Sequence, residues 1–580
     1  MENRLPDALK ARGIDIGLAL MLTVLLSYGH FLWVRHYRFG LVLEIDEAGY
    51  MSQAMAYANA LKFGGISAWL SALSFPTKFA PLSPIVTSIL MAELGLDENV
   101  AFYTHILFYA GTVLVTFWWM RACSSRLAAT TASMLVATLP IIVLYTRTYQ
   151  YGLPTTFFFL LANFAYYKSE RFSSLLWSFC VGVALGLMLL SRTMSIAFLP
   201  AFGLVWFVDS RKAFRQNLLG LCIAVVMFLL VAIPWYALNF KEIFGYLFSF
   251  GYGANSSEYG GSKSMLSIDY LKMRNRYFMD SLFPFHFVCL FMLFVIGVFQ
   301  QIRACVGRRE STIPSLYVPS AVAIFCAAIL LSSKNIGSGF DAPLYPVMAL
   351  CAICALPMWI TNCGLRQTAL VVIVLGCLLV GYFESDTSVC TRGPNFIVRS
   401  LMGSSQKNLC DGSIGEYIRG IGYKPGEDKP YWSDISVRDQ RRWRDVSAAL
   451  ADRLADVDKS RNAVIYVTRN RLVNVNTVML ESIKRYGYIL PAAQIEPAVL
   501  PRSYADYRKW FDTVSAPAST CAVVMMSNTT GDFFPRPDLD ILHKVVSDRG
   551  FVLTARIATP ESDMLAELWS SPIGCGNEKK

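Results

Sequence analysis

The chain has 580 residues, of which 54% are hydrophobic and only 16% are charged. Soluble proteins carry about a quarter charged residues, and the mean hydropathy here is +0.43, so this composition excludes an ordinary soluble enzyme and indicates a membrane protein. The formal net charge is +11. Because the lysines and arginines stand in short clusters between apolar runs, we interpret this charge as a topology signal and expect no nucleic-acid partner.

Apolar runs of spanning length recur along the first two thirds of the sequence. We expect about eleven transmembrane helices, at residues 16–34, 100–120, 127–145, 152–167, 173–190, 193–208, 218–238, 282–302, 313–332, 342–361 and 368–383. The first run is too long for a cleavable signal peptide and is interpreted as a retained span. A further apolar run at 79–95 contains Pro81, Pro84 and Glu93, and we place it flat on the outer membrane surface.

The basic residues orient these spans. With a cytoplasmic N-terminus, most cations of the short loops fall inside, and the short outer segments hold only Arg147, Arg192 and Lys334. This asymmetry follows the positive-inside rule, and an odd number of spans then places the C-terminal part outside. We therefore expect a multi-pass protein of the bacterial inner (plasma) membrane. Its transmembrane domain, residues 1–384, would have long extracytoplasmic loops at 35–99 and 239–281.

Residues 385–580 have the composition of a soluble domain, which this topology makes periplasmic. Helical and strand patterns alternate in it and predict an α/β fold. The expected helices are at 437–457, 474–486, 504–514 and 538–548, and the expected strands at 463–467, 521–526, 551–557 and 564–569. The domain carries Cys390, Cys410, Cys521 and Cys575. In an oxidising compartment they would form two disulfides in one of three pairings, and otherwise they are free thiols.

Three carboxylates, Glu44, Asp46 and Glu47, follow the first span directly, and an amphipathic helical pattern begins with them. One interpretation is structural, because acids near a helix N-terminus are favoured by the helix dipole and by capping. The other is catalytic, because a carboxylate at this place can act as a general base.

Cations occur on the same expected side of the membrane. Lys78 precedes a proline-rich run, and Arg147, Arg192 and Lys334 stand at the ends of spans. Each alone is typical of a residue that anchors a helix or contacts lipid phosphate. Together with the acids, on the side where positive charge is avoided, they indicate a functional polar cluster.

The second outer loop contains Glu258 and Tyr259 in a Gly- and Ser-rich segment. This segment either closes over a bound headgroup or is only a connector. No phosphate-binding P-loop, nucleophile elbow or zinc-type spacing of His and Cys occurs in the sequence, so we do not expect ATP hydrolysis.

Five short motifs in chain order resemble the polytopic type-C glycosyltransferases (GT-C fold), in the branch of protein O-mannosyltransferases and the lipid A aminoarabinose transferase. They are Asp46-Glu47-Ala48-Gly49-Tyr50, Lys78-Phe79-Ala80-Pro81-Leu82, the glycine-containing stretch from Gly182 to Arg192, Pro234-Trp235-Tyr236, and Lys334 with Tyr345-Pro346. The resemblance covers roughly residues 10–385. It departs from the family pattern at Thr77, where an acid is frequent, and at Leu153, where an aspartate is common.

The resemblance implies a sugar donor linked to polyprenyl phosphate, an extracytoplasmic active site and inversion at the anomeric carbon. It makes Asp46 the expected base, with Glu47 positioning the acceptor or sharing that role. The expected ligands of the donor phosphate are Lys78, Arg192, Lys334 and, more weakly, Arg147. The expected substrate contacts are Tyr50, Tyr345, Glu258 and Tyr259. These cations could balance the phosphate without a metal, and a divalent metal is the open alternative.

Two other functions stay open. A flippase or transporter of lipid-linked sugars would place ionisable groups near the middle of the membrane, whereas these spans are nearly free of charge. An inactive scaffold that binds envelope partners through its C-terminal domain is the third hypothesis. The sequence does not specify the sugar, or whether the acceptor is a lipid, a glycan or a protein.

Overall fold

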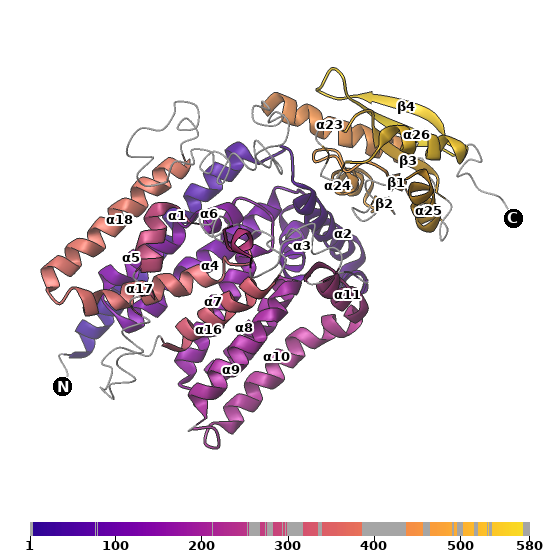
Figure 1. Ribbon diagram of the computed structural model, residues 1–580. Helices are drawn as coiled ribbons and strands as arrows, with labels where there is room; N and C mark the ends of the chain where they lie inside the picture. Colours follow the sequence, from indigo (N-terminus) through magenta and orange to yellow (C-terminus); the bar gives the residue numbers. More distant parts are fainter. Residues whose placement is uncertain are drawn as a thin grey trace. The chain divides into compact units, whose positions relative to one another are not determined.

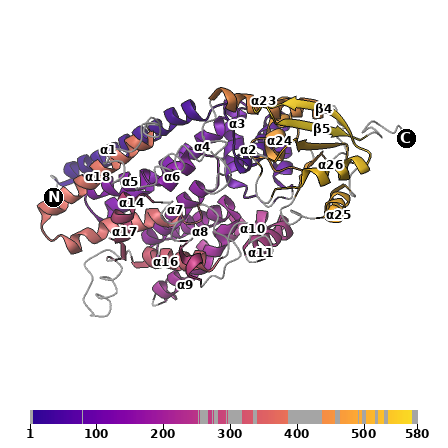
Figure 2. The ribbon, with the colours of Figure 1, turned by 45° about the horizontal axis from the view of Figure 1, so that its top comes forward.

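The computed structural model describes residues 4–251, 267–297, 317–333, 339–385, 437–455, 464–529 and 532–571, apart from short gaps inside these ranges. They form two units (Figures 1 and 2). The first, called the membrane unit below, comprises Met1–Arg35, Ser74–Ser83 and Phe102–Ile414. The second, called the outer unit after the topology that the sequence predicts, comprises His36–Leu73, Pro84–Ala101 and Gly415–Lys580. The outer unit thus combines most of the first expected outer loop with the C-terminal domain.

Apolar helices make up the membrane unit (Figure 1). They are α1 (Arg4–Tyr37), α4 (Val100–Cys123), α5 (Arg126–Ala137), α6 (Pro140–Thr146), α7 (Gly152–Ser169), α8 (Leu175–Ser191), η1 (Thr193–Phe198), α9 (Leu199–Ser210), α10 (Leu218–Leu238), α11 (Phe240–Gly251), α14 (Pro284–Phe287), η2 (Val288–Met292), α16 (Tyr317–Ser332), α17 (Leu344–Trp359) and α18 (Cys363–Ser385). Among the described residues, five helices are long and apolar enough to span a bilayer, and a bent pair adds a sixth. The chain is therefore a multi-pass membrane protein, as expected. The number of eleven stays a prediction, because the run at 282–302 lies partly outside the described residues.

The bent pair is α5 and α6, which meet at an angle of 65°. We expected an uninterrupted span at 127–145, and the structure breaks it after Ala137. Pro140 explains the break, because it has no N–H to donate to the preceding turn. It stands instead at the start of α6, where a helix needs no such donor. Helix α6 then ends at Thr146, and its C-cap is Arg147, one of the expected phosphate ligands.

Helices α8 and α10 lie side by side, in contact along their backbones (Figure 1). A Cβ atom on Gly182 would stand 2.1 Å from the carbonyl oxygen of Ala224, and one on Gly186 would stand 2.7 Å from Cβ of Val231. Small residues four apart let membrane helices approach this closely. The glycine-containing motif that ends at Arg192 is therefore a packing motif, and α8 ends at Ser191, directly before Arg192.

The C-terminal part of the outer unit is an α/β domain, as expected. Its helices are α23 (Val437–Leu454), α24 (Val475–Tyr486), α25 (Tyr504–Ser515) and α26 (Leu539–Asp548), and its strands are β1 (Val464–Tyr466), β2 (Ala492–Gln494), β3 (Ala522–Met526), β4 (Val552–Ala558) and β5 (Leu565–Ser570). The strand order is β2-β1-β3-β5-β4. Strand β1 is parallel to β2 and β3, and β5 is antiparallel to β3 and β4. An apolar cluster covers each face of the sheet.

The sequence pattern did not predict β2. This strand has only three residues, two of them alanines, and its side chains are half-buried. Alanine is depleted in strands, and no alternation can be recognised over three positions. Cys521, just before β3, is disulfide-bonded, which favours the disulfide interpretation of the cysteines. The other three of the four tail cysteines lie outside the described residues.

The first expected outer loop contributes α2 (Ile45–Leu73) and α3 (Leu82–Leu94). With 13 residues, α3 is roughly 20 Å long at 1.5 Å per residue, which is short for a bilayer core of about 30 Å. The placement of the run at 79–95 on the outer membrane surface stays a prediction. Within the outer unit, α24 of the C-terminal domain packs on α2 (Figure 2).

Arg444 on α23 connects the two parts of the outer unit. Its Nη1 and Nη2 atoms donate to the two carboxylate oxygens of Glu98 at 3.0 and 2.8 Å. Its Nε atom donates to Glu481 on α24 at 3.1 Å, and Nη1 also donates to the carbonyl oxygen of Leu41 at 2.9 Å. Lys484 completes the cluster, with its Nζ atom 3.2 Å from Glu98.

The Glu98 carboxyl is 4% exposed. Burial alone would raise its pKa, but the charges of Arg444 and Lys484 outweigh burial and hold the pKa at about 2. Because this value lies below the usual 4.5, Glu98 stabilises the folded state above pH 4.5, and this contribution of about 3 kcal/mol is lost as the pH falls toward 2.

We expect Arg444→Met to lower the melting temperature of the purified full chain at pH 7, because it removes the guanidinium that pairs with both buried carboxylates, at a cost of about 3–5 kcal/mol. The difference from the wild type should shrink as the pH falls from 4.5 toward 2, where Glu98 becomes protonated in both proteins. Thermal unfolding followed by tryptophan fluorescence measures both effects. Arg442→Met, which removes an arginine that is 52% exposed, is the control. An equal difference at pH 7 and pH 2 would contradict this account.

Candidate functional site

The two acids of the Asp-Glu pair have different environments. Glu47 is fully buried, and its carboxylate accepts a hydrogen bond of 2.6 Å from the Arg38 guanidinium. Arg38 is buried as well, in the turn that follows α1. The same Glu47 oxygen accepts the backbone N–H of Glu44 at 3.2 Å. Glu47 therefore stabilises the turn between α1 and α2 through these two hydrogen bonds.

Glu44 caps the N-terminus of α2. Its Oε2 atom accepts the backbone N–H of Asp46 at 2.8 Å and that of Glu47 at 3.3 Å. Burial raises the pKa of the Glu44 carboxyl well above its usual value, repulsion by Asp46 and Glu47 adds to this, and the two N–H groups oppose it. The structural interpretation of the acids, helix capping, is thus correct for Glu44.

Asp46 is the exposed member of the three carboxylates. It stands in the first turn of α2, where the helix dipole favours a negative charge. Tyr50 follows one turn later on the same helix and is half-buried. The chemistry that this end of α2 can offer to a substrate therefore consists of one accessible carboxylate held on a rigid helix end.

Arg192 and Tyr345 in the membrane unit both meet the short segment before α17. The Nη1 atom of Arg192 donates to the carbonyl oxygen of Gly339 at 2.9 Å, and its guanidinium lies 3.7 Å from the ring centroid of Phe340. The hydroxyl of the buried Tyr345 donates to the carboxylate of Asp341. The structure thus brings these two expected site residues to one segment of the membrane unit.

Arg147 lies inside the membrane unit and is 3% exposed. Its guanidinium stacks 4.2 Å from the ring centroid of Trp33 and donates to the backbone carbonyl of Glu384 at 2.9 Å. Its Nε atom is 3.4 Å from Nδ1 of His30. These contacts join α1, the end of α6 and the end of α18, so Arg147 has a clear structural role.

Four expected site residues lie outside the described residues: Lys78, Glu258, Tyr259 and Lys334.

The residue before Lys78 is held by a contact that the sequence pattern did not predict. Asn239, buried at the end of α10, accepts the backbone N–H of Thr77 at 2.6 Å. Asn239 follows the Pro-Trp-Tyr motif by three positions, and an asparagine at a helix C-terminus is the signal that could have identified it.

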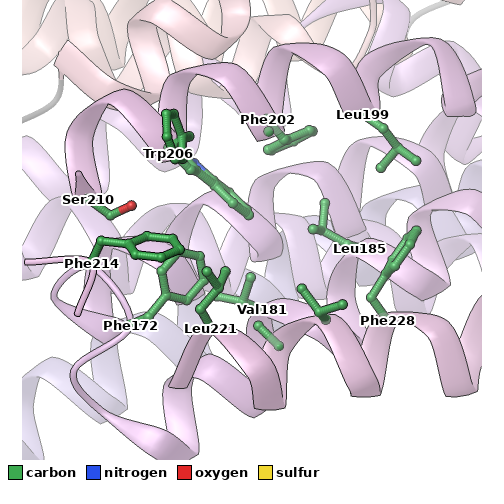
Figure 3. Close-up of a pocket in the computed structure, with 14 residues that line it drawn as sticks. Phe172, Val181, Leu185, Leu199, Phe202, Trp206, Ser210, Phe214, Leu221 and Phe228 are labelled. Carbon is green, nitrogen blue, oxygen red and sulfur yellow. The ribbon is translucent and has the colours of Figure 1, made fainter. Parts of the chain in front are cut away.

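An apolar pocket of about 340 Å³ lies between α8, α9 and α10 of the membrane unit (Figure 3). Figure 3 shows rings and aliphatic side chains around it, among them Phe202, Trp206 and Phe228, with the Ser210 hydroxyl at one end. Such a lining offers almost no hydrogen bonds, so it suits hydrocarbon and does not suit a sugar. Among the residues that the structure describes, no group of three or more metal-ligating side chains comes together.

Gly339 has a φ of +75°, and a Cβ atom on it would lie 2.1 Å from the hydroxyl oxygen of Tyr145. We expect Gly339→Ala to displace the carbonyl group that Arg192 binds and to lower the melting temperature, because a left-handed conformation and a steric clash act together. Gly40→Ala is the matched control, because Gly40 has a φ of +68° with no atom within 4 Å. That change should cost only the conformational term of about 1–2 kcal/mol. Equal melting temperatures for the two variants would contradict the clash.

Comparison with known proteins gives two matches in sequence. Residues 78–236 match a family model described as dolichyl-phosphate-mannose-protein mannosyltransferase. YkcB of Bacillus subtilis (strain 168), named as a candidate mannosyltransferase, is 29% identical over 129 residues. That match covers 22% of this chain and only 18% of YkcB.

Two solved structures match nearly the whole chain. ArnT from Cupriavidus metallidurans bound to undecaprenyl phosphate has a TM-score of 0.53 at 12% identity, and the match covers 97% of this chain and 99% of ArnT. ArnT in the apo state has a TM-score of 0.52 at 13% identity, and the match covers 97% and 98%. The helical membrane unit, the C-terminal sheet and these matches together show that the chain has the GT-C fold of the polytopic type-C glycosyltransferases.

Proposed function

We propose that this chain is a membrane glycosyltransferase that takes a sugar from a polyprenyl-phosphate-linked donor and transfers it to an extracytoplasmic acceptor with inversion. The observation that carries the proposal is the N-terminus of α2, where capping by Glu44 and the Arg38–Glu47 ion pair leave Asp46 as the exposed carboxylate. The GT-C fold and the mannosyltransferase family match over residues 78–236 support it.

In this reaction, Asp46 takes a proton from the acceptor hydroxyl or amine while that atom forms a bond to the anomeric carbon. The bond between the anomeric carbon and the phosphate oxygen breaks at the same time, and its electron pair leaves with the polyprenyl phosphate. A single displacement from the face opposite the leaving group inverts the anomeric carbon. Glu47 acts indirectly, because it is bonded to Arg38 and holds the turn that carries Asp46.

Cations must stabilise the negative charge that develops on the departing phosphate. If basic residues of the chain supply these cations, the reaction needs no metal. We assign this role to Arg192, together with Lys78 and Lys334. A guanidinium presents its N–H donors in a planar fork whose geometry matches phosphate oxygens. Arg147 has the weaker claim, because its contacts with Trp33 and Glu384 are structural.

The remaining assignments concern substrate contacts and topology. Tyr50, on the same helix as Asp46, and Tyr345 are proposed contacts of the sugar or acceptor, with Glu258 and Tyr259 of the second loop. We place the protein in the bacterial inner membrane with a cytoplasmic N-terminus and an extracytoplasmic C-terminal domain. The acceptor is a lipid, a glycan or a protein.

We expect Asp46→Asn to lower turnover by about 10²–10⁴-fold, because the amide cannot accept the proton. The purified chain is incubated with undecaprenyl-phosphate mannose or undecaprenyl-phosphate aminoarabinose and cell-envelope extract as the acceptor source. Mass spectrometry then detects undecaprenyl phosphate and the glycosylated product. Glu93→Gln removes one negative charge from an exposed acid of α3 and should retain full activity. Full activity of Asp46→Asn contradicts the base, and translocation of donor across vesicles without covalent transfer would favour a transporter.

We expect Arg192→Gln to raise the KM for the donor by about 10- to 100-fold, because a charge-assisted hydrogen bond to phosphate contributes about 1.5–3 kcal/mol. Inhibition by free undecaprenyl phosphate should weaken by a similar factor. Lys241→Gln removes an exposed cation of α11 and serves as the control. If neither the KM nor the inhibition changes, Arg192 does not bind the phosphate.

A further inference from the structure

A side chain of the C-terminal domain reaches the residue that precedes Asp46. The Nδ2 atom of Asn476, in the first turn of α24, donates a hydrogen bond of 2.7 Å to the carbonyl oxygen of Ile45, the first residue of α2. The two residues are 431 positions apart in the chain and belong to the same unit. An asparagine of the soluble domain is thus bonded to the backbone that carries the candidate base.

Asn476 is itself held firmly. The side chain of the buried Asn474 accepts the backbone N–H groups of Asn476 at 3.1 Å and Thr477 at 3.2 Å. The side-chain amide of Asn474 donates to the backbone carbonyls of Asn470 and Arg471. Thr477 completes a capping box with Asn474. This network fixes the start of α24, so the Asn476 amide projects from a rigid support.

Gly49 has a role that follows from this contact. A Cβ atom at position 49 would lie 2.9 Å from Nδ2 of Asn476, so a larger residue would push the amide away from Ile45. The glycine of the Asp-Glu-Ala-Gly-Tyr motif is therefore the position that lets the C-terminal domain approach the first turn of α2. Ile45 and Gly49 lie one turn apart, with Asp46 between them in the chain.

We propose that Asn476 is a positioning residue for Asp46: it sets the direction of the first turn of α2 and so the place of the carboxylate. This inference rests on the proposed function. It gives the C-terminal domain a role in the reaction, although none of its side chains needs to touch the substrate. A base displaced by about 1 Å can cost about 100-fold in rate, because proton transfer depends steeply on geometry.

The first test uses the purified full chain with Asn476→Ala and, separately, Gly49→Ala. Both should lower kcat by about 10- to 100-fold and leave the KM for undecaprenyl-phosphate sugar unchanged, because they move the base and not the donor. Combining them should give no further loss, since the alanine at 476 removes the clash. Asn528→Ala is the matched control, because the Asn528 amide also donates to a backbone carbonyl, that of Asp563 at 3.1 Å. Wild-type kcat in both variants overturns the inference.

The second test needs no enzymatic activity and separates this inference from the proposed function. Hydrogen–deuterium exchange of the full chain should become faster in the peptide that contains residues 44–52 in Asn476→Ala, and stay unchanged there in Asn528→Ala. Unchanged exchange together with wild-type kcat would overturn the positioning role. Faster exchange, with Asp46→Asn fully active, would retain the contact as a conformational restraint but overturn its role in placing a base.

Discussion

One arginine determines how the outer unit is assembled. Arg444 binds the backbone carbonyl of Leu41, before α2, and the carboxylate of Glu98, after α3, so a single guanidinium joins both ends of the loop that contains α2 and α3. Glu481 on α24 holds the same guanidinium from the other side. Buried charges are stable only when each has its partner, so these groups specify one arrangement of loop and domain rather than many. Closing a long loop costs entropy, and a contact at both ends offsets that cost with few residues.

Within this frame, the burial of charge explains why three neighbouring acids have three different roles. Burial removes the hydration of the Glu47 carboxylate, and its ion pair with Arg38, at 2.6 Å, compensates for this loss. Glu47 is therefore a structural group. The Glu44 carboxylate accepts hydrogen bonds from two backbone N–H groups at the start of the helix. Asp46 points to the exposed side between them. A motif of two adjacent acids therefore needs only one member to act on a substrate, because the other makes that member rigid.

The sequence predicted what depends on local patterns. Helical periodicity located α23, α24, α25 and α26, and short apolar runs located four of the five strands. The runs of β1 and β3 are apolar throughout because these two strands are buried on both faces. Pro140 is a sequence signal for the break between α5 and α6. The prediction missed it because it used only the length of the apolar run, which continues across the break. Contacts between distant segments were not readable. Arg444 and Glu98 are 346 residues apart, and nothing in the spacing of either marks the other. Arg38 had a weak signal, a cation on the side where positive charge is avoided.

Glycines recur wherever a functional group must be placed by backbone contact. Gly182 and Gly186 let α8 touch α10, and α8 is the helix that ends just before Arg192. Gly339 turns the chain beside Tyr145 so that its carbonyl faces Arg192, and Gly49 makes room for Asn476 beside α2. At Gly339 and Gly49 the constraint acts on the backbone near a charged side chain. A charged group does its chemistry only from a defined position, and close backbone packing defines position more sharply than a long side chain with many rotamers can. In the proposed mechanism, each charge that reacts or binds is thus combined with a small residue that determines where the charge stands.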